Sequence, residues 1–173
     1  MTTEVSQLGY VVADVDDAVR HWVEVLGVAP FFVYREVTLA TCLVRGEPVD
    51  LTLSVAFGQA GKLQIELIQE LSDTPSAYTG STPGQPHHVA IWTRDYDRDV
   101  DTFRARGLVD LMWGSSSGRA DERFVYFASS GPGPLVEVVE LLDAKAAMYG
   151  AIADAAREYD GTAPVREASL LGG

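Results

Sequence analysis

The sequence predicts an α+β fold made of two tandem modules, each with the order β-α-β-β-β, and an added C-terminal helix. The main observation is an internal repeat. Residues 7–16 align without a gap on residues 88–97, at an offset of 81 residues from position 7 to position 88. Residues 64–68 align on residues 135–139, at an offset of 71 residues from position 66 to position 137. Because such a repeat indicates a duplicated structural unit, we expect a pseudo-twofold axis between the modules.

The first module is predicted to span residues 5–71. Residues 5–12 alternate and are rich in valine, as in a strand. Asp14 suits a helix N-cap because its carboxylate can accept from amides of the first turn. Apolar residues then recur at helical spacing, and Gly27 is typical of a left-handed helix end. Three strand-like runs complete the module: Phe31–Val37, Val49–Phe57 and Lys62–Leu71.

A linker leads into the second module, which is predicted to span residues 87–142. Residues 72–86 hold serine, threonine, glycine and three prolines, a composition typical of a linker. A strand comes first, and Asp95 then caps a helix that ends before Gly107. The strands of this module are expected at His87–Thr93, Val109–Trp113, Arg123–Ala128 and Leu135–Leu142. Residues 1–142 therefore form one predicted domain.

The remaining residues, 143–173, are predicted to form a helix and a tail. An amphipathic helix is expected at Ala144–Tyr159. Its apolar stripe consists of Met148, Ile152, Ala155 and Tyr159. We expect this stripe to pack against the body of the protein or a second subunit, and on this ground we expect a homodimer. From Gly161 onward we expect a loose tail.

Composition restricts the classes of partner. The net charge is −12, which argues against nucleic-acid binding because contact with phosphates needs clustered lysine and arginine. A strongly acidic chain is also poorly suited to anionic membranes, and no apolar run approaches the ~20 residues that span a bilayer. Cys42 is the one cysteine, and the N-terminus lacks a basic segment followed by an apolar one. We expect a cytoplasmic protein that binds a small-molecule substrate.

Four residues that can bind a metal fall at repeat-related positions. Gln7 aligns with His88, and Glu66 aligns with Glu137. Side chains alternate along a strand, so Gln7 should face away from the bulkier side chains that lie under the helix. Glu66 and Glu137 each lie between apolar neighbours, where a buried carboxylate is costly unless it is paired or bound to a metal. Each residue alone could be a surface or satisfied polar group, and His87 is expected to face solvent or start its strand. The symmetry of the four favours a site.

The doubled pattern, with "HHVAIW", "LQIELIQ" and "PLVEVVEL", resembles the vicinal oxygen chelate superfamily over residues 5–142. This superfamily includes glyoxalase I, methylmalonyl-CoA epimerase, extradiol dioxygenases and bleomycin-resistance proteins. The segments "VLGVAPFF" and "RGEPVDLTLSVAFGQAGKLQIELIQ" look most like the epimerase-like branch. The resemblance implies that the modules form one open barrel-like cleft. It also implies that the first and last strands of each module supply the metal ligands, which are Gln7, Glu66, His88 and Glu137 here.

The ligand set departs from the epimerase pattern, which usually has histidine and glutamine where this chain has Gln7 and Glu66. The order Gln, Glu, His, Glu instead resembles glyoxalase I of the eukaryotic type. Three oxygen donors and one imidazole suit a divalent ion such as Zn, Ni, Co or Mn, which stabilises an enolate as a Lewis acid. By this resemblance Glu137 would serve as the base, with Glu66 as its symmetric counterpart. The cleft lining is expected to include Val11, Ile68, Trp92 and Val139.

The sequence therefore predicts a metal-dependent enzyme of isomerisation, epimerisation or lyase chemistry, acting on a small substrate with adjacent oxygens. The alternative is a metal-free binding or resistance protein of the bleomycin-resistance type. This alternative is disfavoured because all four ligand positions carry residues that can donate to a metal. An extradiol dioxygenase is disfavoured because its iron triad uses two histidines and one carboxylate. Substrate identity is left open, since fold does not fix function.

Overall fold

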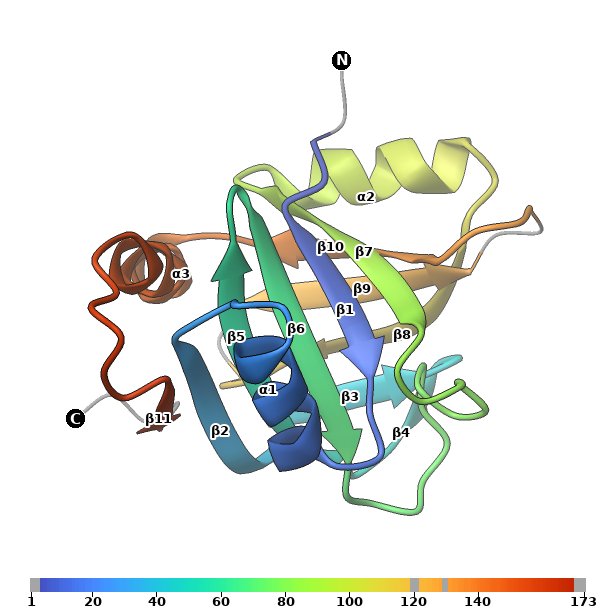
Figure 1. The fold of residues 1–173 in the computed structure, drawn as a ribbon. Helices are drawn as coiled ribbons and strands as arrows, with labels where there is room; N and C mark the ends of the chain where they lie inside the picture. The colour runs from blue at the N-terminus through green and yellow to red at the C-terminus, as the bar shows by residue number, and fades with distance from the viewer. Residues whose placement is uncertain (1–3, 119–121, 129–130, 170–173) are drawn as a thin grey trace.

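The computed structural model describes residues 4–118, 122–128 and 131–169. The chain has a mixed α+β fold with one curved, unclosed sheet of eleven described strands and a C-terminal helix (Figure 1). The strands follow in the spatial order β11-β2-β5-β6-β1-β7-β10-β9-β8-β3-β4. The two predicted modules are recognisable as the neighbouring blocks β2-β5-β6-β1 and β7-β10-β9-β8, which mirror each other in order.

The first block contains β1 (Gln7–Val11), α1 (Val15–Glu24), β2 (Phe31–Thr38), β5 (Thr52–Ala60) and β6 (Leu63–Glu70). Asp14 caps α1 as predicted, because its side chain accepts from the amide of Asp17. Helix α1 packs on one face of the block, over Ile65 and Leu67 of β6. Alternation along β6 then turns Glu66 toward the opposite face.

The second block contains β7 (Pro86–Thr93), α2 (Tyr96–Ala105), β8 (Val109–Ser115), β9 (Arg123–Ala128) and β10 (Leu135–Glu140). Helix α2 packs over Val138 of β10. Its neighbours Glu137 and Val139 therefore lie on the opposite face, as Glu66 does in the first block. The same alternation places the odd-numbered residues of β1 on that face, with Val11 in the central hydrophobic core.

The two blocks meet along β1 and β7, which pair in an antiparallel ladder. The ladder places Gln7 opposite Ala90 and Gly9 opposite His88. On their other edges, β1 pairs with β6 and β7 pairs with β10, both in parallel. The four strands that carry the predicted donors are therefore adjacent at the centre of the sheet.

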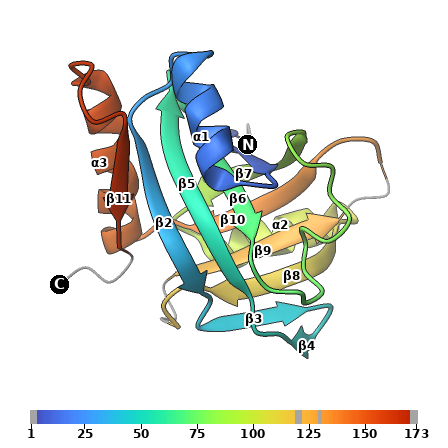
Figure 2. The ribbon, with the colours of Figure 1, turned by 60° about the horizontal axis from the view of Figure 1, so that its bottom comes forward.

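A hairpin that the sequence did not predict extends the first block toward the second. It consists of β3 (Thr41–Val44) and β4 (Glu47–Pro48). β3 pairs with β8, so Cys42 lies opposite Gly114. The hairpin follows β8 at the edge of the sheet (Figure 2).

The C-terminal helix, α3 (Asp143–Arg157), packs within the chain against β5. Its most buried residues are Tyr149 and Ile152, and Met148 packs beside them. The predicted loose tail from Gly161 is wrong for Val165–Ala168, which form β11 and pair in parallel with β2. Arg35 of β2 supports this pairing, because it binds Glu167 at 2.9 Å and Asp16 at 2.7 Å. Residues 170–173 lie outside the described residues.

Among the described residues, no helix combines the length and apolar character needed to cross a bilayer.

Candidate metal centre

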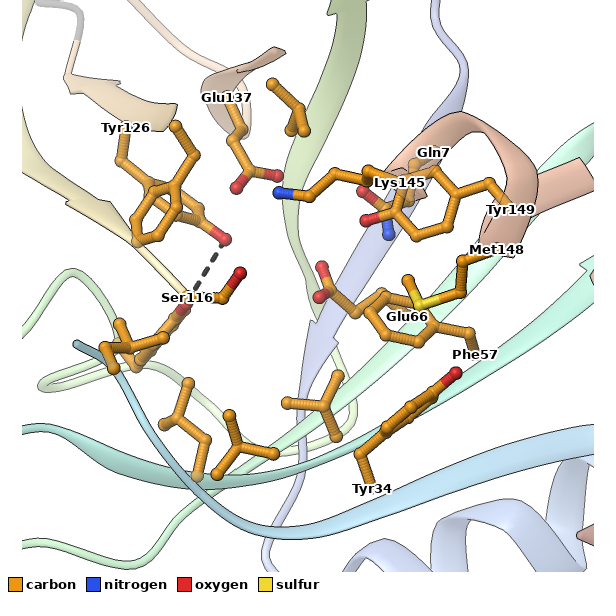
Figure 3. Close-up of a pocket in the computed structure, with 17 residues that line it drawn as sticks. Gln7, Tyr34, Phe57, Glu66, Ser116, Tyr126, Glu137, Lys145, Met148 and Tyr149 are labelled. Atoms are coloured by element: carbon orange, nitrogen blue, oxygen red, sulfur yellow. Dashed lines mark hydrogen bonds between the residues drawn. The ribbon is translucent and has the colours of Figure 1, made fainter. Parts of the chain in front are cut away.

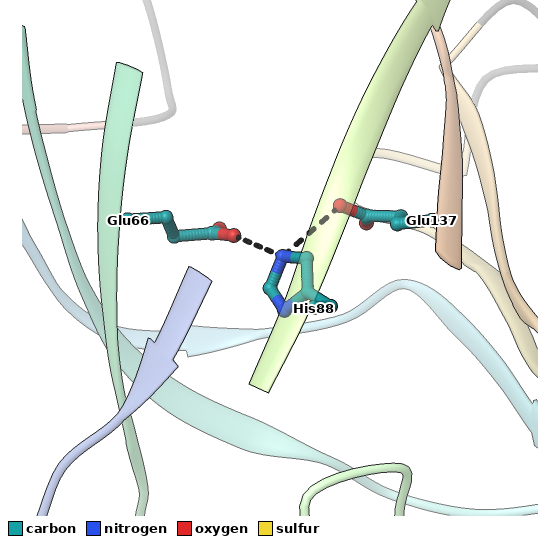
Figure 4. A group of neighbouring side chains, drawn as sticks. All are labelled: Glu66, His88 and Glu137. Atoms are coloured by element: carbon teal, nitrogen blue, oxygen red, sulfur yellow. Dashed lines mark hydrogen bonds and ion pairs between the residues drawn. The ribbon is translucent and has the colours of Figure 1, made fainter. Parts of the chain in front are cut away.

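Three of the four predicted donors converge at the centre of the sheet. Glu66, His88 and Glu137 each offer a donor atom, and these atoms lie within 4.8 Å of one another. Nε2 of His88 lies 3.1 Å from Oε2 of Glu66 and 3.4 Å from Oε2 of Glu137 (Figure 4). The imidazole therefore lies between two carboxylates that come from different modules.

Burial raises the free-energy cost of charge on the side chains of this cluster. The His88 side chain is fully buried, and those of Glu66 and Glu137 are 12% and 8% exposed. Burial raises the pKa of Glu66, and the neighbouring Glu137 carboxylate raises it further. Burial alone would lower the pKa of His88, but hydrogen bonds to Glu137 and Glu66 raise it to about 9. A cation between the imidazole nitrogen and the carboxylates is thus strongly favoured, whether that cation is a proton or a metal ion.

His87 lies beside the cluster, is half-buried and is the second residue of β7, so it starts the strand and does not face solvent, which is one of the two places expected for it. Its Nε2 lies 3.0 Å from the carbonyl oxygen of Ala77, and its Nδ1 lies 3.0 Å from Nδ1 of His88. A carbonyl only accepts, so Nε2 of His87 carries a proton. Burial lowers the pKa of His87 to about 4, so the ring is neutral and its Nδ1 accepts from His88. The hydrogen bond to His88 leaves Nε2 of that ring directed at the carboxylates.

Gln7 is buried in the same region, at 1% exposure. Its Nε2 donates to Oε1 of Gln64 at 3.0 Å. Gln64 is also fully buried and is its neighbour on the parallel strand β6. This hydrogen bond occupies the nitrogen of the Gln7 amide. Gln7 also lines the cavity described next, together with Glu66 and Glu137.

A cavity of about 100 Å³ opens in front of the carboxylates (Figure 3). Aromatic and aliphatic side chains from both modules and α3 form most of its wall. They are Tyr34, Val37, Leu39, Leu53, Val55, Phe57, Tyr78, Phe124, Tyr126, Val139, Met148 and Tyr149. Of the four residues expected to line the cleft, Val139 does so. Val11, Ile68 and Trp92 pack in the hydrophobic core, where the Trp92 ring stacks on Tyr149.

Two polar features of the cavity were not predicted from the sequence. Tyr78, from the predicted linker, donates through its hydroxyl to that of Tyr126 at 3.2 Å, and both side chains are buried (Figure 3). Lys145 of α3 extends toward the carboxylate of Glu137. Burial lowers the pKa of Lys145, whereas the charge of Glu137 raises it. A signal was available for Lys145, because it precedes Met148 of the predicted apolar stripe by three positions and so lies on the same helix face.

The donor chemistry fits a divalent metal ion. Two carboxylates and an imidazole nitrogen converge at one buried point, and the amide oxygen of Gln7 is available from the same cavity wall. Oxygen and imidazole donors of this kind suit divalent ions of borderline hardness. A hydrogen bond to the second ring nitrogen, as His87 makes to His88, is the usual support of a metal-binding histidine.

The fold and this site define a two-module protein whose candidate metal centre lies between the modules. A sequence model of the glyoxalase/bleomycin resistance protein/dioxygenase superfamily matches residues 6–127. The chain therefore belongs to that superfamily. The matched region ends before β10 and α3, so Glu137 and Lys145 lie outside it. No curated protein sequence matches the chain significantly.

Solved structures show the same fold at low sequence identity. A hypothetical protein from Bacillus halodurans has a TM-score of 0.56 at 17% identity, over 83% of this chain and 97% of its own. Methylmalonyl-CoA epimerase from Mycobacterium tuberculosis has a TM-score of 0.55 at 21% identity, over 85% and 95%. A variant of 4-hydroxymandelate synthase from Streptomyces coelicolor has a TM-score of 0.56 at 19% identity, over 81% of this chain and 39% of its own.

Proposed function

We propose that the protein is a metal-dependent enzyme that moves a proton next to a carbonyl group. Its substrate is a small molecule with two adjacent oxygens, and the reaction is an isomerisation, an epimerisation or a lyase reaction that passes through an enolate. The observation that carries this proposal is the convergence of Glu66, His88 and Glu137 on one wall of a largely apolar cavity.

Four residues would hold the ion: Gln7, Glu66, His88 and Glu137. Zn, Ni, Co and Mn all suit this donor set. Such an ion supplies Lewis-acid stabilisation of the negative charge that develops on a substrate oxygen. The Gln7–Gln64 hydrogen bond supports the role of Gln7, because it leaves the amide oxygen as the end available to a cation.

Glu137 is the proposed base, and Glu66 is its symmetric counterpart. Both line the cavity. Nε2 of His88 lies 3.1 Å from Oε2 of Glu66 and 3.4 Å from Oε2 of Glu137. A base must reach the proton that it removes, and the choice of Glu137 over Glu66 follows the resemblance to glyoxalase I. The apolar wall around it limits the access of water to the carbanion.

Metal analysis of the purified protein tests this proposal. We expect about one equivalent of a divalent ion, which dialysis against a chelator removes and which returns with added metal. His88→Ala should lose the ion, whereas His21→Ala should keep it because His21 is an exposed residue of α1. A parent protein that binds no divalent ion at micromolar concentration would refute the proposal.

The second candidate is a metal-free small-molecule binding protein. Two observations favour it: the cavity is mostly aromatic and aliphatic, and a proton on His88 can satisfy the two carboxylates without a metal. This candidate predicts tight binding of an apolar ligand that chelators do not affect. Extradiol dioxygenase chemistry ranks below both, since the cluster has one histidine where the iron triad has two.

Two further expectations belong to this proposal. The apolar stripe of α3 was the reason to expect a homodimer, but Met148 and Ile152 are covered by the body of the same chain. Sedimentation of the protein at high micromolar concentration measures self-association directly. We also propose a cytoplasmic location, which cell fractionation tests.

A further inference from the structure

The hydroxyl of Tyr126 points into the space that the carboxylates of Glu66 and Glu137 also face (Figure 3). Tyr126 of β9 is paired with Glu137 of β10 in the sheet. Residues that lie opposite each other on neighbouring strands project their side chains to the same face of the sheet. The cavity therefore holds a phenolic hydroxyl beside the carboxylate that we propose as the base.

Aromatic contacts fix the ring of Tyr126. Its centroid lies 5.0 Å from that of the His88 ring and 5.9 Å from that of the Phe124 ring, and both pairs are nearly perpendicular. The residue is 2% exposed, and a side chain packed in this way has little freedom to change its rotamer. The hydroxyl therefore has a defined position relative to the carboxylates.

Tyr78 orients the hydroxyl of Tyr126, because its own hydroxyl donates to that oxygen at 3.2 Å. Tyr78 lies in an ordered segment, where its backbone amide donates to Oγ of Ser76 at 3.0 Å and the carbonyl oxygen of Ala77 accepts from His87. A hydroxyl that accepts one hydrogen bond still has its own proton to donate. Within the described part of the chain, the structure shows no acceptor for the proton of Tyr126. This proton is therefore available to a ligand.

Both hydroxyls keep their protons at neutral pH. Burial raises the pKa of Tyr126 and that of Tyr78 well above the ordinary value of 10, and the carboxylates of Glu66 and Glu137 raise both further. A fixed neutral donor in a mostly apolar cavity can stabilise negative charge that develops on an oxygen during a reaction. The carboxylates cannot do this, because an ionised carboxylate only accepts hydrogen bonds.

We propose that the hydroxyl of Tyr126 donates a hydrogen bond to the substrate oxygen on which negative charge develops, and that Tyr78 positions this hydroxyl. The inference rests on the proposed function, because removal of a proton next to a carbonyl group places charge on the carbonyl oxygen. Tyr126 would touch the reacting atoms, whereas Tyr78 would act through Tyr126. The cavity is about 100 Å³, and one of about 150 Å³ holds benzene, so the part of the substrate inside it has about four nonhydrogen atoms.

Exchange of solvent deuterium into glycolaldehyde, a hydroxy aldehyde of this size, tests the inference with the zinc-supplemented protein. Tyr126→Phe should lower kcat about 10²–10³-fold, the usual worth of one such donor, and leave KM nearly unchanged. Tyr78→Phe should lower kcat about 10-fold, and it should have no further effect when added to Tyr126→Phe. Tyr10→Phe is the matched control, because the Tyr10 ring packs against Trp22 of α1 on the other face of the sheet.

A second measurement uses the unsubstituted protein, in case Tyr126→Phe fails to fold. With tyrosine carrying carbon-13 at the carbon that bears the hydroxyl, the NMR signal of Tyr126 should shift with glycolaldehyde while that of Tyr10 stays. An unmoved Tyr126 signal, or equal kcat in Tyr126→Phe and the parent, would overturn the inference. The proposed function fails separately: if the parent binds no metal and exchanges no deuterium, that function is refuted and the Tyr126 signal alone decides the inference.

Discussion

The imidazole ring of His88 lies directly against the backbone of Gly9, its partner in the antiparallel pair of β1 and β7. A Cβ atom on Gly9 would lie 1.8 Å from Cε1 of His88, inside the volume of the ring. The absence of a side chain at position 9 therefore allows the ring to reach the two carboxylates. His88 fills the space that any other residue at position 9 would occupy.

We expect Gly9→Ala to displace the His88 ring and weaken metal binding at least tenfold. The steric crowding between β1 and β7 should also lower the free energy of unfolding by about 1–3 kcal/mol. Metal competition assays and denaturant unfolding measure the two effects. Gly150→Ala is the matched control, because Gly150 lies in α3 with open space around its Cβ position, and alanine there should be neutral or stabilising. Equal metal affinity in Gly9→Ala and the parent would contradict the steric role of Gly9.

Replacing His87 should weaken metal binding without removing a ligand. His87→Phe keeps a ring but deletes the acceptor for the His88 Nδ1 proton. Loss of such a supporting hydrogen bond typically lowers metal affinity about 10- to 100-fold. Competition with a chromogenic chelator measures this change, and His21→Ala serves as the control at an exposed site. An unchanged affinity in His87→Phe would show that the ring of His88 is held by its other contacts.

Glu137→Gln should keep the fold and lose proton transfer. The amide is nearly isosteric with the carboxylate, and Gln7 already places an amide among the proposed ligands. The expected loss is a factor on the order of 10²–10⁴, the usual worth of a positioned base. Exchange of solvent deuterium into an α-hydroxy ketone or an acyl thioester measures it. Glu66→Gln should have the smaller effect, and equal activity of Glu137→Gln and the parent would remove Glu137 from the mechanism.

The metal-free protein should lose stability as the pH rises through 9. The pKa of His88 is raised from 6.5 to about 9 in the folded state. The imidazolium therefore contributes stability that is fully present below pH 6.5 and is lost as the pH rises through the folded value. The expected loss is on the order of 1–3 kcal/mol.

Denaturant unfolding at several pH values measures this loss. The metal-loaded protein is the control, because a metal ligand binds as neutral imidazole and no longer needs the proton. A metal-free protein whose stability is constant between pH 6.5 and 9 would show that His88 is neutral in the folded state.

The sequence predicted the parts of the fold that depend on local periodicity and on the repeat. Both modules, their helices and the convergence of Glu66, His88 and Glu137 follow from those two signals. The hairpin at residues 41–48 was missed because β3 gains its stability from β8, which lies far along the chain. Strand β11 was missed for the same reason, since four residues at 165–168 are ordered by pairing with β2.

The sequence did not predict the details of the site in which the two modules differ. Gln64 aligns with Leu135, so the repeat gave no reason to expect a buried amide that binds Gln7. On α3 the predicted inward stripe included Tyr159, whereas Tyr149 is the buried tyrosine. Lys145 lies three residues before Met148 and seven before Ile152, so it shares the inward face of α3, but the apolar pattern left this charged residue out.

The pairing of β1 with β7 joins the two halves of the chain, and the proposed ligands are divided between these halves. Gln7 and Glu66 come from the first half of the chain, whereas His88 and Glu137 come from the second. A fragment of either half would hold two of the proposed ligands and one side of the cavity. Neither fragment would hold the whole proposed ligand set, and a bound ion would stabilise the association of the two fragments. Metal affinity would then report how well the halves recognise each other, as it does for an ion shared between subunits.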